Sequence, residues 1–149
     1  MKVKLLGLAG VVVVAALAVA VPSFGKEAPI IAKTIAVGKI QATTIQAQTG
    51  TTILESYRVA PGGSFGWHVH GAPVAVVVAS GTLTVFDPTV GNCKPFKVSK
   101  GMSFVEPANH IHLARNDGKT PALVYALYLG VSKAADVVHN ESAPAGCHA

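Results

Sequence analysis

Four of the six histidines in this 149-residue chain form two His-x-His pairs, His68 with His70 and His110 with His112. Residues two apart in a β-strand point to the same face, so each pair directs both imidazoles to one side of its sheet. Neutral imidazole is a common ligand of zinc, copper, iron and nickel. Two such pairs on neighbouring strands would surround one metal ion, whereas an isolated pair is more often two surface or core histidines. The residues that frame the pairs decide between these interpretations.

The framing residues resemble the cupin family. Its first motif is Gly, five residues, His-x-His, three or four residues, Glu, six residues and Gly. Its second is Gly, five residues, Pro-x-Gly, two residues, His, three residues and Asn. The positions in register with these motifs are Gly62, His68, His70, Gly81, Gly101, Pro107, His112 and Asn116. The resemblance covers about residues 50–130 and is strongest to small exported cupins whose first motif reads Trp-His-x-His-Gly-x-Pro.

This resemblance implies a single cupin barrel, which is a double-stranded β-helix or jelly roll. It also implies that a divalent transition metal is bound by His68, His70 and His112. Cupins of this kind include dioxygenases, isomerases and decarboxylases that act on small molecules. Because cupin barrels often pair through edge strands, the resemblance further implies a homodimer.

The chain departs from the family motifs at two positions. The glutamate of the first motif would fall at Val74, and no acidic residue lies between Gly62 and Gly81. The glycine of the second motif is Asn109, and asparagine tolerates a left-handed backbone better than most residues. We therefore expect the turn to form, but the fourth protein ligand is missing.

Two residues are candidates for auxiliary metal ligands, His110 and Glu106. Without a carboxylate, three neutral imidazoles leave a divalent ion its full charge of +2, which strengthens it as a Lewis acid. Two interpretations stay open at this stage. One is an adapted three-histidine site, and the other is a degenerate site that binds no metal.

The rest of the chain shows strand signals and almost no helix signal, which predicts an all-β fold. Short runs rich in Val, Ile and Thr are separated by Gly, Pro, Asn or Asp, as in sandwiches and barrels. One of Tyr57 and Arg58 must face the interior, and the pattern leaves open which. The expected strands cover residues 30–37, 43–46, 52–59, 74–79, 82–86, 96–98, 102–105, 112–114 and 123–129.

Residues 1–25 have the features of an export signal. Lys2 and Lys4 precede an uncharged apolar stretch, and small residues follow at Ala20 and Gly25. The alternative is an uncleaved membrane anchor, since the stretch is near the lower limit for spanning a bilayer. After the signal we expect N-terminal strands in 26–49, the barrel in 50–131 and a C-terminal strap in 132–149. The mature protein is expected in the periplasm, the cell envelope or the medium, with no membrane segment.

The two cysteines, Cys93 and Cys147, predict a disulfide, because an even pair outside the cytosol is most simply bridged. It would join a mid-chain loop to the C-terminal strap. Neither cysteine has the spacing of a zinc knuckle.

Composition excludes several classes of function. Cleavage of the signal removes two of the 12 Lys and Arg and none of the 7 Asp and Glu, which leaves a net charge of +3. These cations are scattered and form no nucleic-acid module. Three hypotheses remain: a metal-dependent oxygenase or isomerase acting on a small molecule, a non-catalytic module binding metal or a small ligand, and a purely structural barrel. An oxidising compartment retains ferrous iron poorly, which favours Zn, Cu, Ni or Mn over Fe.

Overall fold

The computed structural model describes residues 32–133 and 137–149, so the export signal expected at 1–25 lies outside the described residues. Residues 33–149 form one compact unit. Its strands are β1 (Thr51–Val59), β2 (Ser64–Val69), β3 (Val74–Ser80), β4 (Thr82–Phe86), β5 (Phe96–Ser99), β6 (Ser103–Glu106), β7 (His112–Arg115), β8 (Ala122–Val131) and β9 (His139–Asn140). In this described part of the chain, no helix has the length and apolar character needed to cross a membrane.

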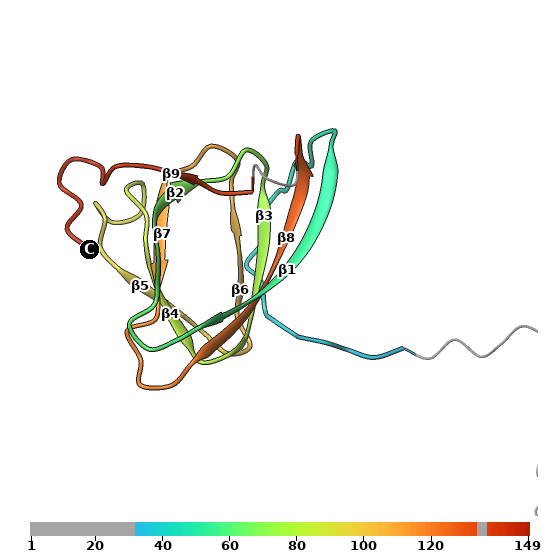
Figure 1. The fold of residues 1–149 in the computed structure, drawn as a ribbon, viewed down its shortest axis with the longest axis horizontal. Coiled ribbons are helices and arrows are strands. Elements are labelled where there is room, and N and C mark those ends of the chain that lie inside the picture. Colours follow the sequence, from blue (N-terminus) through green and yellow to red (C-terminus); the bar gives the residue numbers. More distant parts are fainter. Residues whose placement is uncertain (1–31, 134–136) are drawn as a thin grey trace, which may run out of the picture. The chain divides into compact units, whose positions relative to one another are not determined.

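The strands form two antiparallel sheets that face each other (Figure 1). The four-stranded sheet has the order β1-β8-β3-β6, and the five-stranded sheet has the order β5-β4-β7-β2-β9. The core lies between them and is built mainly from the inward residues of β3, β4 and β8, including Val76, Leu83 and Val124. The prediction of an all-β fold is confirmed.

Alternation along β1 explains how this strand faces the core. Ile53, Tyr57 and Val59 are turned toward the interior, while Leu54 and Arg58 are exposed. Because successive strand residues point to opposite faces, Tyr57 inside requires Arg58 outside. Of the two residues that the sequence left open, Tyr57 is therefore the one that enters the barrel.

The N-terminal segment differs from the expectation. In residues 33–49 the structure has a single isolated bridge, Lys39 to Met102, rather than regular strands. The apolar residues that suggested strands, among them Ile35, Val37 and Ile45, are exposed. Residues with high β-propensity form strands when their side chains are buried, and these side chains are not. The segment is therefore attached to the barrel by only a few backbone hydrogen bonds.

Two loops next to the barrel are fixed by asparagines. Asn109 has a φ of 56°, as expected where the family has glycine. Asn116 is fully buried, and its side-chain amide donates to the carbonyls of Val59 (2.9 Å) and Thr120 (2.8 Å). Its own Oδ1 accepts from the Gly118 amide at 2.9 Å. One side chain thus ties the β7–β8 turn to the end of β1.

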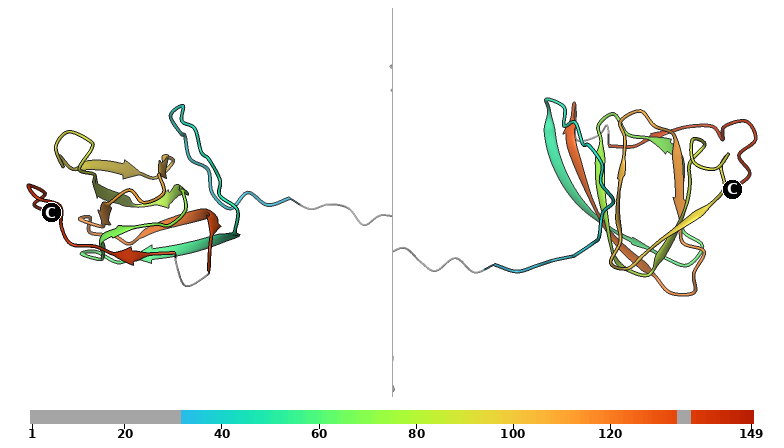
Figure 2. Two further views of the ribbon diagram at one scale, coloured as in Figure 1. Left: turned by 90° about the horizontal axis from the view of Figure 1, so that it is seen from above. Right: turned by 180° about the vertical axis from the view of Figure 1, so that it is seen from behind.

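The C-terminal strap follows the edge of the five-stranded sheet. Its strand β9 pairs with the end of β2, with Asn140 opposite His68. From there the chain continues to its C-terminus, as can be followed in the red segment of Figure 2. Cys147 is bridged to Cys93, with 5.4 Å between their Cα atoms, so the predicted disulfide is present.

Candidate metal centre

Three histidines of the two motifs meet between the sheets. His68 lies on β2, His70 directly follows that strand, and His112 begins β7. Because β2 pairs with β7 with His68 opposite His112, side chains from both motifs reach one point. The potential ligand atoms of the three rings lie within 4.8 Å of one another, and each residue is only 2–3% exposed. The set predicted from the sequence is therefore assembled as three histidines that could hold a metal ion.

Backbone carbonyls fix the orientation of all three rings. The Nδ1 of His68 lies 3.0 Å from the carbonyl of Gly66, that of His70 lies 2.5 Å from the carbonyl of Val137, and that of His112 lies 2.8 Å from the carbonyl of His110. A carbonyl only accepts hydrogen bonds, so each Nδ1 carries the proton and donates it. The neutral ring then presents its Nε2 lone pair, which is the form that binds metals.

A carboxylate from the opposite sheet completes the group. Glu106, at the end of β6, places Oε2 3.2 Å from the Nε2 of His70 and Oε1 3.1 Å from the Nε2 of His112. Its side chain is only 11% exposed. In the register of β3 with β6, Glu106 stands directly opposite Val74, the position where the family motif has its glutamate. The carboxylate that the motif lacks is thus supplied by the neighbouring strand.

This arrangement fits a cation. Two Nε2 lone pairs facing a carboxylate repel it unless a positive charge lies between them. Among the described residues, the Nε2 of His112 is the one buried side-chain nitrogen or oxygen without a hydrogen-bond partner. Ligands bound at about 2.0–2.2 Å to one ion lie about 2.8–3.6 Å apart, depending on the coordination angle, and the contacts of Glu106 fall in this range. The donor set of imidazoles and one carboxylate suits a divalent transition metal.

The electrostatics of the metal-free group follow from burial and these contacts. Burial, together with the neighbouring imidazoles, lowers the pKa of His68 to about 4. Burial alone would raise the pKa of Glu106, but its close contacts with His112 and His70 lower it to about 2. At His112 burial is outweighed by Glu106, which raises the pKa of that ring. Without metal, Glu106 therefore stays ionised, and its charge favours the protonated form of His112.

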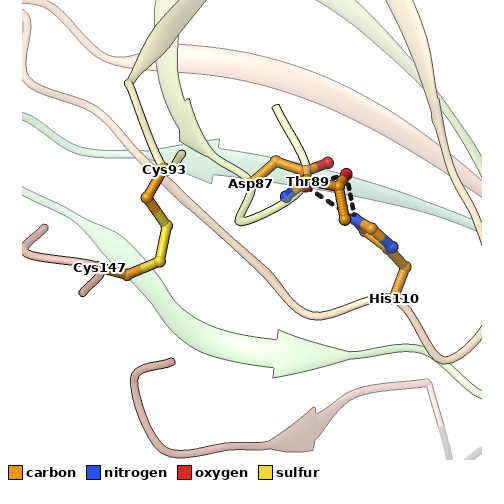
Figure 3. The surroundings of a disulfide bond; sticks show 5 residues. All are labelled: Asp87, Thr89, Cys93, His110 and Cys147. Carbon is orange, nitrogen blue, oxygen red and sulfur yellow. Dashed lines mark hydrogen bonds and ion pairs between the residues drawn. A yellow bond between two sulfur atoms is a disulfide. The ribbon is translucent and has the colours of Figure 1, made fainter. Parts of the chain in front are cut away.

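The second candidate auxiliary ligand, His110, does not join the group. Its Nε2 lies 2.9 Å from Oδ1 of Asp87, which also accepts from the backbone amide (2.8 Å) and the hydroxyl (2.7 Å) of Thr89. Figure 3 shows this cluster next to the disulfide. His110 lies outside β7, so the alternation that places two imidazoles on one face does not apply to it. His110 instead acts through its backbone, whose carbonyl orients His112.

A small cavity of about 30 Å³ adjoins His68, His70 and Glu106. Its walls are mostly apolar and include Phe65, Val76, Leu83, Phe104 and Val124. This volume holds about two water molecules. A separate cavity of about 180 Å³ reaches Glu106 and His112 from the side of Asp87 and His110. The candidate centre therefore has space on two sides.

Sequence reasoning missed a pair of tyrosines at this cavity. Tyr57 from β1 donates to Glu55, and its hydroxyl lies 2.9 Å from that of Tyr128 on β8. Since the Tyr57 proton is used on Glu55, Tyr128 donates to Tyr57. Burial first, and then the contact with Glu55, raise the pKa of Tyr57 to about 12, against a lowering by Tyr128. Burial and the contact with Tyr57 raise the pKa of Tyr128, so both phenols stay neutral. Alternation in β1 placed Tyr57 on the same face as Glu55, but nothing in the sequence indicated its partner.

Comparison with known proteins agrees with this geometry. A cupin domain model (Cupin_2) matches residues 56–128. The polyketide cyclase RemF from Streptomyces resistomycificus is similar in structure, with 17% identity over 66% of each chain and a TM-score of 0.53. BH2720 from Bacillus halodurans has 20% identity over 60% of this chain and 70% of its own, with a TM-score of 0.50. These identities show a shared fold, and no curated protein sequence matches. The motifs, the barrel and the family match together make this chain a member of the cupin superfamily.

Proposed function

We propose that the protein binds one divalent transition-metal ion through His68, His70, His112 and Glu106, and that the bound ion acts on a small molecule. The observation that carries the proposal is the convergence of three buried Nε2 atoms, each with its Nδ1 engaged by a backbone carbonyl. With Glu106 ionised, a divalent ion leaves the group a net charge of +1. When bound, the ion would supply Lewis-acid activation of an oxygen-bearing ligand.

The residues that line the adjoining cavity determine which ligands could reach the metal. The apolar walls of the 30 Å³ cavity limit water near the centre, and the neutral hydroxyl of Tyr128 lies among them. The cavity lies beside His68, His70 and Glu106, so a small molecule there would be held against the candidate ligands. We infer a small and largely apolar substrate with an oxygen donor, for an oxygenase or an isomerase.

A non-catalytic binding module is the second candidate. One observation favours it. Among the described residues, the ionisable side chains that line the cavity are the proposed ligands and two tyrosines, whose raised pKa values keep them from acting as bases near neutral pH. Such a module would hold a metal or a small ligand without turnover.

Metal analysis of the purified full-length chain tests the proposal. We expect about one equivalent of Zn, Mn, Ni, Cu or Fe in the wild type and none in His68→Ala/His112→Ala, with circular dichroism as the control for folding. Absence of metal from the wild type, and no change in its thermal unfolding when Zn²⁺ is added, would overturn it. Bound metal without turnover of diketones, thiols or sugars under oxygen would support the binding module.

We also propose that the protein is exported. The disulfide supports this, since disulfides persist in oxidising compartments. N-terminal sequencing of the protein recovered from the periplasm or medium of a producing cell tests it. A mature N-terminus at residue 21 or 26 is expected, and an uncleaved chain retained in the membrane would contradict it.

A further inference from the structure

The C-terminal strap contacts the candidate centre directly. The carbonyl of Val137 accepts the Nδ1–H of His70 at 2.5 Å, and Val138 lines the adjoining cavity. Directly after Val138, strand β9 pairs with β2 at His68 and Val69. The strap therefore orients one of the proposed ligands and forms part of the wall of the cavity.

Non-covalent contacts hold this part of the strap weakly. Strand β9 has two residues, both exposed, lies at the edge of the five-stranded sheet and pairs only with β2. The amide of Glu141 adds a hydrogen bond of 2.8 Å to the carbonyl of Trp67. Apart from the half-buried Val137 and Val138, so short an edge pairing buries little apolar surface, and it opens easily. The covalent tether at Cys147 keeps the strap near the sheet.

The other cysteine of the disulfide leads to a second ligand. Cys93 lies in the β4–β5 loop, which also carries Asp87 and Thr89 (Figure 3). Asp87 holds the ring of His110, and the carbonyl of His110 accepts the Nδ1–H of His112. Both segments joined by the disulfide thus contribute to orienting a ligand, the strap at His70 and the β4–β5 loop at His112.

We propose that the Cys93–Cys147 disulfide is a redox-controlled clamp on the metal centre. The inference rests on the proposed metal binding. In the oxidised protein the disulfide holds the Val137 carbonyl against His70. A dithiol reductant is oxidised to its own disulfide and delivers two electrons and two protons, which converts the bridge to two cysteine thiols. The strap then leaves β2, His70 loses the acceptor that orients it, and the metal is bound less tightly.

The expected loss of metal affinity on reduction follows from the effect of hydrogen bonds to histidine ligands in other metal sites. Loss of the hydrogen-bond partner of a ligating histidine typically weakens metal binding by about 10- to 100-fold. The three Nε2 atoms and Glu106 remain in the chain, so reduction should weaken binding without abolishing it.

The test compares Zn²⁺ affinity with and without the disulfide in the full-length protein, by competition with a chromophoric chelator. The disulfide-free samples are Cys93→Ser/Cys147→Ser and wild type that has been reduced with a dithiol, blocked with iodoacetamide and freed of reductant. Oxidised wild type treated with iodoacetamide alone is the control. We expect both disulfide-free samples to bind Zn²⁺ about 10- to 100-fold more weakly. Equal affinity in all samples would overturn the inference.

A second pair of variants leaves the disulfide intact. Glu141→Pro removes the amide that donates to Trp67, whereas Glu141→Gln keeps it. We expect weaker Zn²⁺ binding for Glu141→Pro alone, with thermal unfolding recorded to show that each variant is folded. If Glu141→Pro and reduced wild type both bind as tightly as the controls, the strap does not act on the centre.

Hydrogen exchange of the metal-free protein separates this inference from the proposed function. The amide of Glu141 should exchange faster after reduction, because its bond to Trp67 opens with the strap. Unchanged exchange would overturn the clamp whatever the metal affinity. If oxidised wild type binds no metal while exchange still responds to reduction, the proposed function fails and only the mobility of the strap is supported.

Discussion

The two sheets contribute to the candidate centre in different ways. The five-stranded sheet brings His68 and His112 at the motif positions, on paired strands, with His70 directly after β2. The four-stranded sheet lacks the motif glutamate at Val74 and brings Glu106 from the adjacent strand. The five-stranded sheet thus has its ligands at the motif positions of the family. The four-stranded sheet supplies a carboxylate at the same point in space but from a different sequence position.

The difference shows which features each side requires. A histidine ligand needs the right ring position and also an acceptor for its Nδ1–H, and each of these acceptors is a backbone carbonyl. A carboxylate has two oxygens and a flexible stem, so it reaches the same point from a neighbouring register position. The sequence positions of histidine ligands are therefore more restricted than that of the carboxylate. We expect substitution of a histidine to weaken metal binding more than substitution of Glu106.

The largest effect is expected on the histidine side. The binding free energy of a protein zinc site is typically about 10–16 kcal/mol. If four ligands contribute equally, loss of one costs about 3 kcal/mol, which is about 100-fold in affinity. His112→Ala should weaken Zn²⁺ binding by at least this factor in isothermal titration calorimetry. His148→Ala, in the exposed C-terminal tail, is the matched control and should bind as the wild type does. Similar affinities for the two variants would remove His112 from the site.

A smaller effect is expected on the carboxylate side. Glu106→Gln keeps the shape of the side chain but removes its charge, so it should weaken Zn²⁺ binding by about tenfold, or about 1.4 kcal/mol. Glu141→Gln removes an exposed glutamate and serves as the control. If Glu106→Gln binds Zn²⁺ as tightly as the wild type, the centre uses three histidines alone.

Moving the carboxylate back to the family position tests the comparison directly. Glu106→Val should bind Zn²⁺ weakly, and Val74→Glu/Glu106→Val should recover affinity to within a few-fold of the wild type. The reason is that residues directly opposite each other on antiparallel strands have Cβ atoms only about 4.5–5.5 Å apart. The measurement is the same calorimetric titration, with circular dichroism to confirm folding. A double variant no better than Glu106→Val would show that the two positions are not equivalent.

The last prediction concerns the stability of the metal-free protein as the pH is lowered. For both His68 and Glu106 the folded pKa lies below its ordinary value, so the unfolded chain binds more protons. Stability should fall for His68 between about pH 6.5 and 4, and for Glu106 between about pH 4.5 and 2. The raised pKa of His112 acts in the opposite sense.

Urea unfolding of metal-free protein at a series of pH values measures this dependence. Glu106→Gln should flatten the curve below pH 4.5, because glutamine does not titrate. Curves for wild type and Glu106→Gln that remain parallel from pH 5 to pH 2.5 would contradict the assignment.

The fold and the three histidines could be predicted from the sequence because both depend on local pattern. Strand alternation and motif spacing place His68, His70 and His112 without knowledge of the sheet order. Glu106 was only one of two candidates, since its position depends on the register of β3 with β6, which no local pattern encodes. His110 was the other candidate, and it pairs with Asp87 instead. The acceptor at Val137 left no sequence signal, because any residue carries a carbonyl.

The opposition of Val74 and Glu106 also bears on how acidic ligands are recognised in such sequences. Compared with the family motif, this sequence has valine at the glutamate position and an acid 32 positions later. Taken as a pair of facing strand positions, Val74 and Glu106 carry one carboxylate. Two carboxylates at these positions would repel each other in the absence of a cation, which disfavours keeping both. Surveys for metal-binding cupins would therefore do better to score acidic residues per pair of facing strand positions than per motif position.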